Sequence, residues 1–205
     1  MTAAVYCVSA YFAQPLPADW RDRLATRLGA RPRRLGRWAE LGLYGALECL
    51  HPHTTLASNI ALMVSSQHGP SHAMQEAKAQ TRAGLPLPLT FLQIQPSQLL
   101  ATLSAQLHWC GDARFLTHPE PLAVISAALR MAHAHAQGVL VGWVDEIPSE
   151  TSHWLLIQPL RPGDPKPTHA WRSADQWAHT DRASLLRQLQ FLQQDSSGLA
   201  VIIKG

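Results

Sequence analysis

The chain has 205 residues, of which 46% are hydrophobic and 15% are charged, and its formal net charge is +3. This length suffices for one sizeable domain with its own core, and the low charged fraction favours a large buried interface. A nucleic-acid-binding function is excluded, because the densest basic run (Arg31, Arg33, Arg34 and Arg37) lacks interleaved aromatics and belongs to no nucleic-acid-binding motif.

Strands and helices are predicted to alternate along the chain. Short apolar or β-branched runs indicate strands, and apolar residues three or four apart indicate helices. In order, we expect a strand at 5–12, helices at 19–28 and 35–50, a strand at 60–65, a helix at 71–82, a loop at 84–88, a helix at 96–107, a strand at 113–117, a helix at 122–136, strands at 138–144 and 153–158, a proline-rich link at 159–167, a helix at 182–194 and a strand at 199–203. This pattern predicts an α/β fold, a mixed sheet with helices packed on it, in which residues 148–205 form a divergent C-terminal segment.

The chain has eleven histidines, but their spacing does not indicate a metal site. His51 and His53 are two residues apart, and so are His133 and His135, which fall in a predicted helix. Residues two apart on a helix point to different faces, and no HExxH or CxxC motif accompanies either pair. We therefore expect no metal and no cofactor.

The three cysteines are Cys7, Cys49 and Cys110, an odd number at wide spacings that indicates neither a disulfide framework nor a zinc motif. Residues 1–15 are apolar but lack the basic start and the cleavage site of a signal peptide. No uninterrupted apolar run reaches the roughly 18 residues of a membrane span. We expect a cytoplasmic protein without a membrane span.

Four segments carry a family resemblance: RRLGRWAELGLYGALECL (33–50), IALMVSSQHG (60–69), PLTFLQIQPSQLLATLSAQL (88–107) and VLVGWVDE (139–146). In order and spacing they resemble the N-terminal half of β-ketoacyl synthases, which have the thiolase fold. Within that family, the chain resembles the short ketosynthase-like proteins of aryl polyene and related pigment gene clusters, which are similar to chain length factors. The resemblance implies a thiolase-like half fold, with residues 1–205 forming a single truncated ketosynthase-like domain.

The chain departs from the family at the expected nucleophile elbow, which the resemblance places at Thr117, His118, Pro119 and Glu120. In ketosynthases this turn holds the reactive cysteine at a helix N-terminus, which lowers the pKa of the thiol. Here the turn has no cysteine or serine, and the Glu120 carboxylate would repel a thiolate or an oxyanion. The chain also ends before the half that would supply the two histidines and the lysine of a ketosynthase. The resemblance therefore implies no catalytic residues.

The resemblance also implies two contact regions. The strand before the elbow pairs across the ketosynthase dimer axis, which assigns the partner interface to Ala113, Arg114, Phe115, Leu116 and Thr117; unpaired, this strand would be an exposed edge. By analogy with chain length factors, the acyl tunnel would be walled by Phe91, Gln93, Ile94 and Gln95. The alternative is that Phe91 and Ile94 are ordinary core residues and that both glutamines are solvated.

The leading hypothesis is a non-catalytic subunit that pairs with a full-length β-ketoacyl synthase and meets an acyl carrier protein only indirectly, with the basic run as a candidate contact. Two alternatives remain open. One is a structural homodimer. The other is a stand-alone acyl-carrier thioesterase or acyltransferase that uses Ser65, Cys110 or Thr117 as its nucleophile.

Two of these nucleophiles have specific counterarguments. A Ser-His-Asp site built from Ser65 or Ser66 with His68 and Asp145 would lack the Gly-x-Ser-x-Gly elbow. We expect Cys110 to be a small buried hydrophobic residue rather than a reactive thiol.

Overall fold

The computed structural model describes residues 5–13, 15–50, 60–85, 87–120, 123–125, 127–128, 131, 138–159, 169–171 and 201–203. The elements are β1 (Val5–Phe12), α1 (Trp20–Leu28), α2 (Arg37–Leu50), β2 (Ala61–Ser66), α3 (Ser71–Arg82), α4 (Pro88–Gln93), α5 (Ser97–Leu107), β3 (Ala113–Thr117), β4 (Val139–Asp145), β5 (Thr151–Pro159), β6 (His169–Trp171) and β7 (Val201–Ile203).

One mixed sheet of seven strands organises these elements, in the order β3-β2-β4-β5-β1-β7-β6. Strand β2 runs parallel to β3 on one side and to β4 on the other. Strands β4 and β5 form an antiparallel pair, and β1 adds to β5 in antiparallel direction. Every residue of β2 and β4 is buried, as expected for parallel strands covered on both faces.

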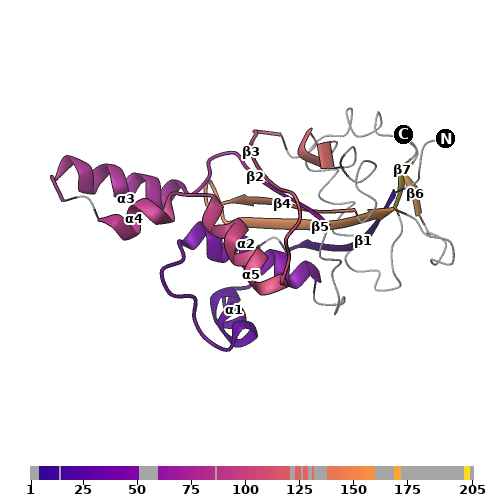
Figure 1. Ribbon diagram of the computed structural model, residues 1–205, viewed down its shortest axis with the longest axis horizontal. Coiled ribbons are helices and arrows are strands. Elements are labelled where there is room, and N and C mark those ends of the chain that lie inside the picture. The colour runs from indigo at the N-terminus through magenta and orange to yellow at the C-terminus, as the bar shows by residue number, and fades with distance from the viewer. Residues whose placement is uncertain are drawn as a thin grey trace.

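Helices cover both faces of the sheet (Figure 1). On one face, α2 packs closely, because a Cβ atom at Gly45 would lie 2.2 Å from the Ser152 hydroxyl oxygen of β5. Helix α5 packs on α2 in the same way, since a Cβ atom at Gly42 would lie 2.4 Å from a Leu99 methyl carbon. On the opposite face, a second core cluster includes the helical residues Val124, Ile125, Ala128 and Met131.

The predicted α/β class, a mixed sheet with helices packed on it, is confirmed. The boundaries of β1, α3 and β3 are those predicted. Helix α5 begins one residue later than predicted, and β2 and β4 are each shifted by one residue toward the C-terminus. The predicted loop at 84–88 extends one residue too far, because 88–93 form α4, a helix that was not predicted. The first residue of α4 is Pro88, whose fixed φ suits the first turn of a helix.

Several predictions fall outside the described residues: the helix at 182–194, most of the link at 159–167, and all four of the paired histidines. The C-terminal segment nevertheless contributes β5, β6 and β7 to the common sheet. Among the described helices, none is long and apolar enough to cross a membrane. The described residues contain no cluster of three or more acidic, histidine or cysteine side chains that could hold a metal ion.

Candidate functional site

Strand β3 forms one edge of the sheet. It pairs with β2 from Leu62 opposite Ala113 to Ser66 opposite Thr117, and among the described residues no strand lies on its other side. Its side chains are exposed or half-buried, in contrast to the fully buried β2. An edge of this kind offers unpaired backbone groups to another strand.

Two backbone hydrogen bonds identify which residues of β3 face outward. The Leu62 amide donates to the Asp112 carbonyl (2.8 Å), and the His118 amide donates to the Ser66 carbonyl (3.1 Å). Since backbone groups alternate in direction along a strand, the even-numbered residues of 112–118 bond to β2. The amides of Ala113, Phe115 and Thr117 therefore point to the open edge.

Helices α3 and α4, with the described residues between them, form an arm that projects away from the sheet (Figure 1). The arm begins a few residues after Ser66, which pairs with the last residue of β3. The base of the arm therefore lies next to the C-terminal end of the open edge strand. All large hydrophobic side chains that are exposed in the described part of the chain belong to the arm: Met74, Leu85, Leu87, Leu89, Phe91 and Leu92. Such a concentration marks an interaction surface.

The residues predicted to wall an acyl tunnel lie at or just after α4. Phe91 is 60% exposed, so the alternative that it is a core residue does not apply. Gln93, Ile94 and Gln95 are half-buried. The backbone of Gln93 rests against Gly36, where an added Cβ atom would lie 3.2 Å from the Gln93 carbonyl oxygen.

The sequence reasoning missed three exposed leucines of the arm, at positions 85, 87 and 89. The signal that could have found them is GLPLPL at 84–89, where leucines alternate with prolines. Prolines exclude this segment from a central strand, so its leucines have no sheet face on which to be buried.

The turn after β3 holds no activated nucleophile in its described residues. Thr117 is exposed, and no hydrogen bond links its hydroxyl to a base. The Glu120 amide donates to His118 Nδ1 (2.9 Å), so this ring nitrogen serves to close the turn. Pro119 and the exposed Glu120 complete it.

The serines near His68 do not form a catalytic triad. Ser65 is fully buried. The Ser66 hydroxyl donates directly to Asp145 Oδ1 (2.7 Å) and accepts from the Gly69 amide (2.7 Å), so both of these bonds serve the turn. His68 Nδ1 lies 3.8 Å from the same carboxylate oxygen and does not stand between a serine and the aspartate.

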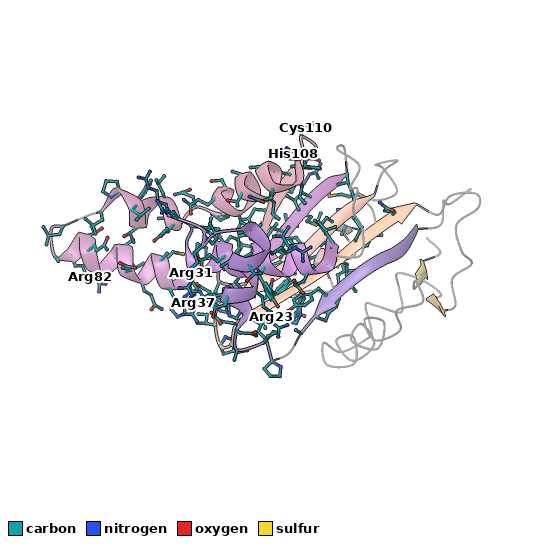
Figure 2. The ribbon with its side chains drawn as sticks, turned by 90° about the horizontal axis from the view of Figure 1, so that it is seen from below. Arg23, Arg31, Arg37, Arg82, His108 and Cys110 are labelled. Carbon is teal, nitrogen blue, oxygen red and sulfur yellow. The ribbon has the colours of Figure 1, made fainter. Side chains whose placement is uncertain are left out.

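The prediction that Cys110 is buried was wrong, because its side chain is exposed. Helix α5 ends in a left-handed residue, His108, and the chain then turns so that Trp109 takes the buried position. The Trp109 indole donates to the Ile60 carbonyl (2.5 Å). Figure 2 shows Cys110 at the surface beyond the end of α5.

No protein-family model matches the sequence, and no curated protein matches it. Solved structures match the fold. One is a ketosynthase (ApeO) in complex with its chain length factor (ApeC) from Xenorhabdus doucetiae, with a TM-score of 0.57, 18% identity, and coverage of 93% of this chain and 90% of that chain. The chain has a thiolase-like fold.

Two further structures share this fold. A type II polyketide synthase acyl carrier protein in complex with its ketosynthase (AntDE:AntF) matches with a TM-score of 0.59 and 12% identity over 78% of this chain. The ishigamide ketosynthase/chain length factor matches with a TM-score of 0.56 and 11% identity over 80% of this chain. In both cases this chain spans 63% of the matched chain, against 90% for the first structure.

The basic run lies between α1 and α2, with Arg37 as the first residue of α2. Arg31 pairs with Asp22 (2.5 Å) and Arg37 with Glu150, a hydrogen bond that raises the pKa of Arg37. Arg33 and Arg34 have no ion pair within the described residues, and with Arg31 they line a pocket of about 490 Å³ beside α5. The pocket has no carboxylate in its described lining, so the charges of Arg33 and Arg34 are not compensated there.

Proposed function

We propose that the chain is a non-catalytic, ketosynthase-like subunit. It pairs one-to-one with a full-length β-ketoacyl synthase and helps to shape the acyl-chain tunnel of that partner in aryl polyene or polyketide-type fatty acid biosynthesis. The observation that carries this proposal is the open edge of β3 next to an arm with six exposed apolar side chains.

The chemistry of the open edge and the arm suits a protein partner. The open edge supplies backbone donors and acceptors, which gain most when another strand covers them. The arm supplies aliphatic and aromatic surface, whose removal from water contributes about 25 cal/mol per Å². A partner that covers the open edge and the arm together would form hydrogen bonds with the backbone groups of β3 and bury the apolar side chains of the arm.

The solved relatives support the class of partner. Two of them are a ketosynthase together with a chain length factor. In the first of these, the match covers 93% of this chain and 90% of the matched chain. The third contains a ketosynthase with its acyl carrier protein. These proteins share the thiolase-like fold with this chain, and we extend their mode of assembly to it as part of the proposal.

The absence of catalysis is argued from the turn after β3. A condensing enzyme needs a nucleophile with a nearby base or a lowered pKa. The described turn offers only an exposed threonine without a base, and the buried Ser65 cannot reach a substrate. Of the three nucleophiles considered for a stand-alone thioesterase or acyltransferase, only Cys110 is left, and it lies before β3, outside this turn.

Co-expression with a full-length β-ketoacyl synthase from an aryl polyene gene cluster is expected to give a one-to-one complex, measured by native mass spectrometry. When an acyl carrier protein loaded with a radiolabelled acyl group is added, the label should appear on the ketosynthase and not on this chain. Each chain purified alone serves as the control. Recovery of this chain only as a homodimer, or acyl label on one of its own side chains, would contradict the proposal.

We further propose that Arg33 and Arg34 contribute to carrier-protein contact, because carrier proteins are acidic and these guanidinium groups lack partners within the described chain. Arg33→Gln combined with Arg34→Asn is expected to lower carrier affinity for the complex by about tenfold at low salt and less at high salt. Asparagine suits position 34, whose φ of 67° lies in the left-handed region.

The matched control for this prediction is Arg23→Gln combined with Arg82→Gln, which removes the same charge at two residues that do not line the pocket. Affinity is measured by fluorescence anisotropy of a labelled carrier protein across a salt series. Equal losses in the two double variants would show that only net charge matters, and the pocket would then have no specific role.

A further inference from the structure

Two buried carboxylates, Asp145 and Glu146, lie where β4 ends, and we call them the carboxylate pair. Asp145 is 5% exposed and Glu146 is 4% exposed. Within the described part of the chain, their hydrogen bonds go to residues 66–72, the turn that leads from β2 into the arm. Neither carboxylate takes part in a catalytic arrangement, so their burial needs another explanation.

Asp145 holds the first half of this turn. Its Oδ1 accepts hydrogen bonds from the Ser66 hydroxyl (2.7 Å), the Gln67 amide (3.0 Å) and the His68 amide (3.1 Å). Its Oδ2 lies 3.2 Å from the same Gln67 amide. Hydrogen bonds to an ionised acceptor are roughly twice as strong as neutral ones, so this side chain fixes the backbone of the turn to β4.

Glu146 holds the start of α3. Its Oε2 accepts from the Ser71 hydroxyl (3.2 Å) and the His72 amide (3.0 Å), and His72 Nδ1 lies 3.3 Å away. Helix α3 has no cap of its own, since its N-cap residue is Pro70 and its first turn contains no acidic residue. Glu146 therefore supplies from a neighbouring strand the anion that a helix N-terminus favours.

The C-terminal end of the arm is held by a separate contact. Gln93, the last residue of α4, packs against Gly36, one residue before α2. Between these two anchors the arm extends into solvent with its apolar side chains exposed (Figure 1). An isolated helix as short as α3 is marginal in water, so its direction depends on the anchors at its base.

We propose that Asp145 and Glu146 are positioning residues of the partner surface: they hold the arm in the direction in which its apolar side chains meet the partner. The identity of that partner rests on the proposed function. The pair touches no reacting group, and its effect on binding acts through the arm. If the free arm already has the orientation that it takes in the complex, it loses less conformational entropy on association, and the affinity for the partner is higher.

Asp145→Asn and Glu146→Gln test this inference, because both keep the shape of the side chain and remove its charge. Each is expected to speed amide hydrogen exchange in α3 and α4 by at least about tenfold while β4 and β5 keep their protection. Affinity for the ketosynthase should fall by about tenfold. Glu48→Gln is the control, since Glu48 pairs with Arg27 on α1 and lies outside the arm.

A second variant separates orientation from helix stability. Ser71→Asp in the Glu146→Ala background returns a carboxylate to the first residue of α3, while the Glu146→Ala side chain offers it no hydrogen bond from the end of β4. We expect exchange in α3 to slow again while affinity stays low. Full recovery of affinity would show that helix stability alone matters and would overturn the positioning role.

The outcomes also separate this inference from the proposed function. Unchanged exchange in the arm, or unchanged ketosynthase affinity in both amide variants, overturns the inference while the proposed function stands. Failure of the wild-type chain to bind a ketosynthase overturns the proposed function, and the exchange experiment still tests whether the pair holds the arm. If Asp145→Asn does not fold, Ser66→Ala removes a single bond to the same carboxylate and gives the corresponding measurement.

Discussion

A Thr117→Pro variant is expected to lose its affinity for the ketosynthase partner by about 100-fold or more while its own sheet stays folded. The Thr117 amide points to the open edge of β3, so proline removes a donor that no bond to β2 uses. The proline ring also occupies the space in which a partner strand would lie. Each lost hydrogen bond costs about 0.5–1.5 kcal/mol, and the steric block adds to that loss.

The control is Thr117→Val, which keeps the amide and the β-branched shape but removes the hydroxyl. Calorimetric titration with the ketosynthase gives the affinity of each variant, and circular dichroism during heating checks that the fold is intact. If Thr117→Pro binds as tightly as the wild type, the partner does not pair with β3, and the assigned interface at residues 113–117 is wrong. If Thr117→Val weakens binding as much as proline does, the hydroxyl rather than the backbone makes the contact.

Larger side chains at Phe91 or Ile94 are expected to shorten the products of the complex. Phe91 is 60% exposed on α4 and Ile94 is half-buried just after it, so both can project into a partner. Phe91→Trp and Ile94→Trp add volume to a close-packed wall, and the longest chain that fits should lose about one extension unit or more. Mass spectrometry of the released acyl chains measures the change.

The comparison variant for this prediction is Met74→Trp, which enlarges an exposed side chain on α3 rather than α4. It should leave product length unchanged. An unaltered product profile in both Phe91→Trp and Ile94→Trp, with the complex still assembled, would remove these residues from the tunnel wall. Shorter products from all three variants would indicate a general disturbance of the arm.

The local pattern of apolar residues was enough to predict most strands and helices of the sheet and its covering layers. The apolar runs of β2 and β4 could be recognised because strands covered on both faces have no polar alternation. The small residues of α2 are visible in the sequence and suit close packing, and Gly45 lies against Ser152 and Trp154 of β5. The absence of a cysteine at 117–120 was likewise visible in the sequence, because it depends only on which residues occupy the turn.

What could not be predicted depends on contacts between distant segments. Asp145 was considered only for a catalytic role and Glu146 for none, since nothing in their local sequence shows that they reach a turn more than 70 residues earlier in the chain. The exposure of Phe91 follows from the direction of the arm, which these tertiary contacts determine. The burial predicted for Cys110 was wrong because the left-handed residue His108 turns the chain, so that Trp109 rather than Cys110 is buried.

The way the arm joins the body gives it the properties of an exchangeable module. Both of its ends are held by contacts at their bases, one to the end of β4 and the other to Gly36, and the segment between them adds no strand to the sheet. Residues 73–92 could therefore diverge, or be transplanted from a related protein, without any change in the packed core. Selection could then tune this segment to a new partner while the rest of the molecule stays constant.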